Sequence, residues 1–172
     1  MQRNLVALLL AAICGLVWAG SALAQDGKVH VLWLGQATLK VTSPKGKVIV
    51  LDPFLVKNPK TPAKYKDLKA LGKVDLILVT HAHWDHFADA PDLAKLNDAP
   101  IFAPAGLNST LLNLEVLPEK LLPRMNKSGT ANPLGPEISI TTVHAEHSSE
   151  LDWKDPITGK VRTFPGGEPI GP

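Results

Sequence analysis

A chain of 172 residues has the length of one domain, and its composition, with 45% hydrophobic and 20% charged residues, is that of a globular protein. The formal net charge of +2 argues against a polyanionic partner, so no nucleic-acid binding is expected. The only cysteine, Cys14, lies within the first 24 residues, which excludes a disulfide scaffold, a thiolate metal ligand and a cysteine nucleophile from the remainder.

Residues 1–24 have the pattern of a secretory signal peptide. Arg3 supplies the positive start, residues 5–19 form an apolar run, and residues 22–24 offer a small-x-small cleavage site. The sequence therefore predicts a periplasmic or secreted protein whose mature domain covers residues 25–172. An uncleaved membrane anchor is the alternative; after cleavage, no stable membrane anchor is expected.

The first part of the mature domain predicts an antiparallel start to a sheet. Runs of apolar β-forming residues alternate with short turns that contain glycine, serine or proline. The predicted strands span residues 29–34, 37–42 and 47–51. A loop rich in lysine and proline follows at 57–64, and residues 63–71 predict a short helix that stops at Gly72.

The next part predicts strands and short helices in alternation. The nearly continuous apolar run at 74–79 is typical of a central strand that is covered on both faces. The remaining predicted elements are a helix at 92–97, a strand at 100–103, a helix at 108–115, an irregular segment at 118–136, a strand at 138–143 and a proline- and glycine-rich end at 155–172. Open α/β sheets commonly place their chemistry at the C-terminal ends of such central strands.

The clearest chemical signal is the stretch of residues 81–86, which follows that buried strand. In an extended loop, residues two apart point the same way, so His81 and His83 can bind one ion from one side. Asp85 and His86 follow where the chain must turn, and they can reach a second ion. Imidazole nitrogen with carboxylate oxygen suits zinc, or manganese or iron, better than calcium. The alternative is a solvated polar loop with incidental histidines.

A second loop with histidines follows the predicted strand at 138–143. It contains His144 and His147, and it lies where a third ligand for the first ion should arrive. Ser148 and Ser149 in this loop have no evident base beside them, so neither is predicted to be a nucleophile.

The pattern H-x-H-x-D-H at residues 81–86 resembles the signature of the metallo-β-lactamase superfamily. One branch of that superfamily is similar in four motifs that occur in the same order; these are residues 51–55, 80–86, 125–130 and 147–149. That branch comprises poorly characterised metal-dependent hydrolases related to ascorbate-phosphate lactonases. The resemblance runs from about residue 29 to the end of the chain. It implies an αββα sandwich, an α/β fold, of which this chain would hold the N-terminal portion only.

The resemblance also implies which residues bind metal. One or two zinc ions, with manganese or iron as alternatives, would be bound at two positions, the first by His81, His83 and His147 and the second by Asp85 and His86. Asp52 would orient a ligand histidine by accepting its free N–H, although a simple turn aspartate at a strand end is the alternative. His144 is the weaker ligand candidate and would lie behind the ligands.

Such a site implies metal-assisted hydrolysis of a small molecule. A metal lowers the pKa of its bound water toward neutrality, and Asp85 would orient the attacking hydroxide. The expected substrate is a small ester, lactone or phosphodiester. A β-lactamase is disfavoured because the chain resembles the lactonase-related branch better, a nuclease is disfavoured by the charge and the export signal, and nothing singles out a thioester.

Members of this branch carry further ligands beyond the matched part: a Gly-Asp-Thr motif whose aspartate bridges the two metals, and a later histidine. Neither follows His147 in this sequence. We therefore expect a domain that is truncated at its C-terminus, with a three-histidine site retained and a second site left with two ligands. The alternative function is accordingly a non-catalytic metal-binding protein or an inactive fragment.

Overall fold

The structure is a computed structural model, and it describes residues 27–171. The predicted signal peptide at 1–24 lies outside the described residues. Within residues 27–171, no helix is long and apolar enough to cross a membrane.

A six-stranded sheet forms the centre of the fold, with the strand order β1–β2–β3–β4–β5–β6. Its strands are β1 (His30–Trp33), β2 (Leu39–Thr42), β3 (Val48–Leu51), β4 (Leu76–Leu78), β5 (Ile101–Pro104) and β6 (Arg124–Met125). The first three strands pair antiparallel through short turns, as predicted, and β3 to β6 pair in parallel through longer crossovers. The chain therefore has a mixed α/β fold, as predicted.

The helices are short. They are α2 (Trp84–Phe87), α3 (Ala90–Asn97), α4 (Ala105–Asn113) and the 3-10 helices η1 (Ala63–Lys66), η2 (Leu68–Leu71) and η3 (Glu119–Leu121). The single helix predicted over 63–71 is wrong, because Asp67 between η1 and η2 is extended and its side chain accepts the N–H of Lys69. Residues 84–87 were not predicted to be helical, although Asp85 lies in the first turn of α2.

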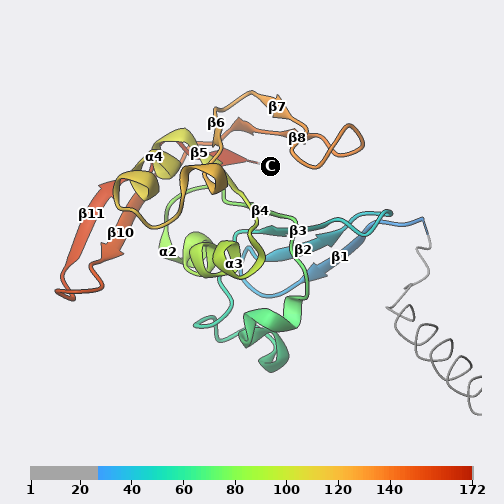
Figure 1. The fold of residues 1–172 in the computed structure, drawn as a ribbon, viewed down its shortest axis with the longest axis horizontal. Helices are drawn as coiled ribbons and strands as arrows, with labels where there is room; N and C mark the ends of the chain where they lie inside the picture. Colours follow the sequence, from blue (N-terminus) through green and yellow to red (C-terminus); the bar gives the residue numbers. More distant parts are fainter. Residues whose placement is uncertain (1–26, 172) are drawn as a thin grey trace, which may run out of the picture.

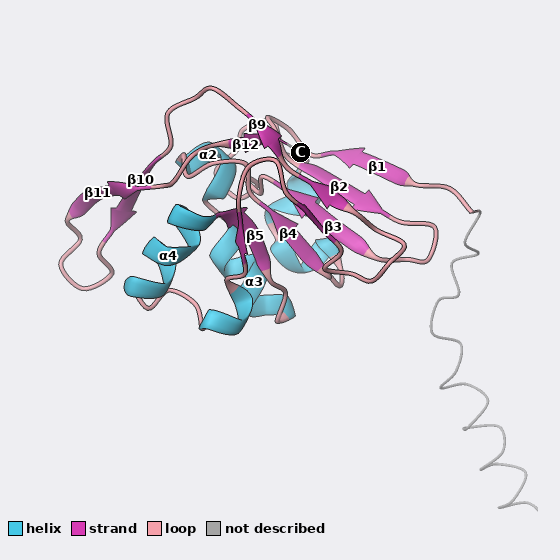
Figure 2. Cartoon of the chain, turned by 90° about the horizontal axis from the view of Figure 1, so that it is seen from above, coloured by secondary structure: helices cyan, strands magenta, loops and turns pink. Residues whose placement is uncertain are grey.

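Helices α3 and α4 lie on one side of the sheet (Figure 2), and the main core lies between these layers. Leu93 of α3 and Leu107 of α4 belong to one buried cluster with Ile77 of β4 and Ile101 of β5. Each of these four side chains is fully buried. Burial of one such side chain stabilises the fold by about 1.5–3 kcal/mol. The packing of this layer therefore holds the C-terminal end of β4 in place.

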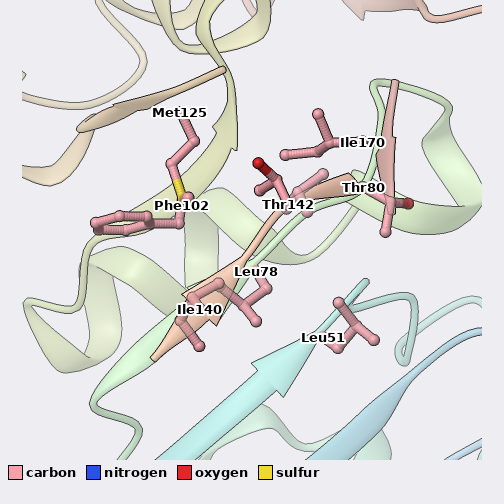
Figure 3. A pocket seen from close by; sticks show the side chains of 9 residues that line it. Leu51, Leu78, Thr80, Phe102, Met125, Ile140, Thr142 and Ile170 are labelled. Carbon is pink, nitrogen blue, oxygen red and sulfur yellow. The ribbon is translucent and has the colours of Figure 1, made fainter. Parts of the chain in front are cut away.

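The opposite side of the sheet is covered only in part, by segments from the C-terminal third of the chain. Leu78 of β4 is partly exposed there, whereas its neighbour Ile77 is fully buried. Figure 3 shows the apolar cavity on this side, between the sheet and the covering segments. Side chains around it include Leu51, Leu78, Phe102, Met125, Ile140 and Ile170. Leu76, on the same face of β4 as Leu78, is fully buried, so the predicted cover of the central strand is found on both faces except at Leu78.

The C-terminal third contains more strands than predicted. They are β7 (Thr130–Ala131), β8 (Ile140–Thr141), β9 (Val143–His144), β10 (Glu150–Lys154), β11 (Val161–Pro165) and β12 (Ile170–Gly171). The strand predicted over 138–143 is split at Thr142, which is buried and donates its hydroxyl to the carbonyl of Asn126 (2.6 Å). The proline- and glycine-rich end contains β11, which forms a hairpin with β10 that projects beside α4 (Figure 1), and β12, which pairs with β9.

Candidate metal centre

Two loops bring the predicted ligands together. One follows β4 and carries His81 and His83, and the other follows β9 and carries His147. Strand β12 aligns the two loops, because it pairs with β9 and the N–H of Ile170 donates to the carbonyl of Thr80 (3.0 Å). The β-sheet pairing therefore places residues more than sixty positions apart at one edge.

Ser149 ties these loops directly. Its hydroxyl oxygen accepts the N–H of Ala82 (3.2 Å), and its carbonyl accepts the N–H of Gly166 (2.7 Å). A side chain at Gly166 would collide with Ala82 and with the Ser149 hydroxyl, which would lie 2.7 Å from the added Cβ. Glycine is thus required for the close approach of these three segments.

The three histidines form a compact group. One ligand nitrogen from each of His81, His83 and His147 lies within 4.8 Å of the others. Their ring centroids are 4.7 Å apart for His81 and His83, 4.7 Å for His81 and His147, and 4.9 Å for His83 and His147. Three imidazoles at this spacing are a ligand set for zinc and related transition metals, and they do not suit calcium.

The hydrogen bonds around His81 determine which of its nitrogens is free. The Thr80 hydroxyl donates to Oδ2 of Asp52 (2.8 Å), so it accepts a proton from Nδ1 of His81 (3.0 Å). The lone pair therefore lies on Nε2, which is buried and has no hydrogen-bond partner. Burial, followed by the charges of the neighbouring histidines, lowers the pKa of His81 to about 4. His81 thus presents an unpaired nitrogen toward the other two rings, and a metal ion would satisfy it.

Asp52 lies at the end of β3 and is almost fully buried. Its Oδ1 accepts the N–H of Thr80 (2.7 Å), and its Oδ2 pairs with Nδ1 of His86 (2.8 Å). Asp52 was expected to accept the free N–H of a ligand histidine. It pairs directly with His86, and it reaches His81 through the Thr80 hydroxyl. A φ of +43° is uncommon for a residue other than glycine, so the surrounding structure holds this carboxylate in a strained backbone position.

Asp85 and His86 lie in α2, beside the three histidines. Nε2 of His86 is 3.7 Å from Oδ2 of Asp85, and its ring centroid is 4.1 Å from that of His81. Burial acts to lower the pKa of His86, but the hydrogen bond and charge of Asp52, with the charge of Asp85, raise it overall. With a proton on Nδ1 facing Asp52, the neutral ring turns its Nε2 lone pair toward Asp85.

The structure does not bring His144 to this group. It lies in β9 with about half of its side chain exposed, and Nε2 contacts Oε1 of Glu146 at 2.7 Å.

Several residues near the ligands had no signal in the sequence. Nε2 of His83 lies 3.3 Å from both Oε2 of Glu150 and Oγ of Ser148. The side chain of Gln36, in the turn after β1, reaches Asp85 and His86 across about fifty residues of sequence. Thr80 and Ser148 lay within quoted motifs, at residues 80–86 and 147–149, so those motifs could have indicated them.

A wide cleft of about 660 Å³ adjoins His147. Ser149 and Glu150 line one part of it, and residues 163–169 line the rest. Of the three histidines, His147 lines this cleft, so the cleft is a candidate route for a small molecule toward the group.

Comparisons with known proteins identify the family. Residues 47–164 match the family model of the Beta-lactamase superfamily domain. The chain is 56% identical over 171 residues to a metal-dependent hydrolase of Polaromonas sp., a match covering 99% of this chain and 61% of the relative. It is 59% identical over 146 residues to a metal-dependent hydrolase of Cupriavidus necator, covering 84% of this chain and 50% of that one.

A solved structure is also similar. It is a metallo hydrolase from the hyperthermophilic archaeon Ignicoccus hospitalis, with a TM-score of 0.61 and 25% identity over 78% of this chain and 53% of that chain. The chain thus spans between about half and three fifths of the length of these proteins.

Proposed function

This chain belongs to the beta-lactamase superfamily, as its H-x-H-x-D-H pattern predicted, and from that premise we propose that it acts as a zinc-dependent hydrolase. The observation that carries the proposal is the buried, unpartnered Nε2 of His81 within a group of three imidazoles. A buried polar atom without a partner is costly, and a bound cation would remove that cost. The names of the similar proteins from Polaromonas and Cupriavidus support metal-dependent hydrolysis.

In this proposal His81, His83 and His147 hold the ion. When bound, such an ion acts as a Lewis acid that makes water nucleophilic near neutral pH. Asp85 extends its carboxylate beside the histidines and orients the attacking water by accepting a hydrogen bond from it. Asp52 and Thr80 fix the proton on Nδ1 of His81, so its other nitrogen keeps the lone pair that an ion requires.

The proposed substrate is a small ester, lactone or phosphodiester that enters through the cleft beside His147. No protein nucleophile is needed, because water is the attacking group. Ser148 lies beside His83, but in this proposal that histidine binds the ion instead of acting as a base. We place the reaction outside the cytoplasm on the signal-like pattern of residues 1–24, and cell fractionation would test that location.

The test is to measure bound zinc and to screen hydrolysis of ester, lactone and phosphodiester substrates in the wild type and in His83→Ala. We expect about one tightly held zinc in the wild type, and loss of both zinc and hydrolysis in the variant. His144→Ala is the matched control, because it removes a nearby histidine that lies outside the group. Equal zinc binding by all three proteins, or zinc without hydrolysis of any substrate in the wild type, would contradict the proposal.

A further inference from the structure

Gln36 lies directly over the Asp85–His86 pair. Its side-chain Nε2 is 2.8 Å from Oδ2 of Asp85 and 3.4 Å from Nε2 of His86. These two atoms are the ones that Asp85 and His86 would offer to a second metal ion. The amide group therefore stands between the lone pairs that such an ion needs.

The donors and acceptors match without change of protonation. Asp85 Oδ2 is an acceptor, and Nε2 of His86 is an acceptor when the proton on Nδ1 faces Asp52. An amide NH₂ group has two hydrogens, one for each acceptor. The neutral amide thus satisfies the pair that would otherwise attract a cation.

Hydrogen bonds of the β1–β2 turn fix the backbone conformation of Gln36. Its φ of +53° is uncommon for a residue other than glycine, and such strain tends to occur at functional positions. The indole N–H of Trp33 donates to the Gln36 carbonyl (2.9 Å), and the N–H of Thr38 donates to the carbonyl of Gly35 (3.0 Å). The turn between β1 and β2 therefore directs this one side chain toward α2.

We propose that Gln36 limits the number of bound metal ions. Its amide occupies the coordination positions of Asp85 and His86, so the centre holds one ion tightly and a second ion only in competition with Gln36. This inference rests on the proposed three-histidine metal site. It gives Gln36 a role in metal stoichiometry, apart from any contact with substrate. An ion enters the second position only when the amide turns away and releases both acceptors.

The test is a zinc titration by calorimetry, with the metal-to-protein ratio measured independently, on the wild type, Gln36→Glu and Gln36→Asn. Gln36→Glu keeps the length of the side chain but replaces the donor with a third acceptor, so second-ion affinity is expected to rise at least about tenfold. Gln36→Asn tolerates a positive φ but is one methylene shorter, so a smaller rise is expected. Asn132→Asp makes the same change from amide to carboxylate at an exposed site and should leave both affinities unchanged.

First-ion affinity and the circular dichroism spectrum show whether each variant is folded. If the first ion binds and Gln36→Glu leaves second-ion affinity unchanged or lower, the role of Gln36 is wrong and the proposed function stands. If the wild type binds no ion, the three-histidine site and the proposed function fail together. Two equally tight ions in the wild type would also overturn the role of Gln36.

Discussion

The three-histidine group and the Asp85–His86 pair lie side by side, but they differ in how they are built. The first group joins two loops that are far apart in sequence, and it leaves Nε2 of His81 buried without a partner. The pair comes from a single turn of helix, and its polar atoms are occupied by Gln36 and Asp52. The comparison teaches that two sets of potential ligands can differ in whether their atoms already have protein partners. We expect that difference, as well as ligand identity, to affect metal affinity.

The largest effect is expected from removing a ligand of the three-histidine group, and its absence would contradict this comparison. His147→Ala should weaken binding of the first ion by at least about 100-fold, because it removes one of three ligands. Substitution of residues that only hydrogen-bond to ligands typically weakens metal binding by about 10–100-fold. His86→Ala should weaken the first ion less than about tenfold, because its Nε2 faces Asp85. Zinc titration of both variants measures the difference. Similar losses in the two would show that the groups are one site.

Asp52→Asn should have the next largest effect, and it should act on both groups. Oδ2 of Asp52 accepts from both His86 Nδ1 and the Thr80 hydroxyl, and Oδ1 accepts the Thr80 N–H, so an amide NH₂ group cannot replace either oxygen. At the Oδ2 position it would remove the contacts that fix both histidine tautomers, and at the Oδ1 position it would face the Thr80 N–H. We expect first-ion affinity to fall by about tenfold, measured by zinc titration. Asp75→Asn is a control, because Asp75 is also a well-paired aspartate next to β3 but lies away from the histidines. An unchanged affinity in Asp52→Asn would contradict the bridging role.

Ser149→Ala should affect the three-histidine group alone, because Ser149 joins the two loops that carry it. The change removes the acceptor for the N–H of Ala82 and should cost about 1 kcal/mol in the free energy of unfolding. Urea unfolding measures this cost, and a zinc titration should show a matching small loss at the first site only. Ser139→Ala is the control, because Ser139 is exposed and its hydroxyl accepts from Asn132 instead of joining the two loops. A larger effect on the second ion than on the first would contradict the assignment.

The smallest expected effect is a difference in proton binding between the two groups in the metal-free protein. Because the pKa of His81 is lowered to about 4, the unfolded state binds more protons than the folded state below about pH 6.5, and His81 makes the fold less stable as pH falls through this range. The raised pKa of His86 has the opposite sign: its contribution is present at low pH and is lost as pH rises through its folded value. Imidazole titration by NMR should show His86 protonating at a higher pH than His81. The reverse order would contradict the comparison.

The sequence could predict what depends on local order. The apolar run at 74–79 and the cluster at 81–86 adjoin in sequence, so the placement of His81 and His83 at the end of a buried strand followed from that run. The tight turns among the first three strands likewise require antiparallel pairing. The superfamily resemblance, confirmed by the family match, then supplied the role expected of His147.

The rest depends on contacts between distant residues, which no local pattern contains. Gln36 meets Asp85 because β1 and β4 run in the same direction and end at the same edge of the sheet, and α2 begins shortly after β4. The β10–β11 hairpin was missed because its strands are polar on one face and surrounded by glycine and proline, while cross-strand pairs such as Leu151 with Phe164 supply its stability. His144 lies three residues before His147, but it belongs to β9, which pairs with β12. Its side chain contacts Glu146 and does not join the other histidines.

Asp52 Oδ2 serves two donors, the Thr80 hydroxyl and Nδ1 of His86, each at 2.8 Å. A cation on the far nitrogen of His86 would make its Nδ1–H a stronger donor and draw the shared oxygen toward that ring. The oxygen would then hold Thr80, and through it His81, less firmly. We therefore expect occupancy at one position to lower affinity at the other, and by thermodynamic reciprocity each ion would weaken the binding of its neighbour by the same factor.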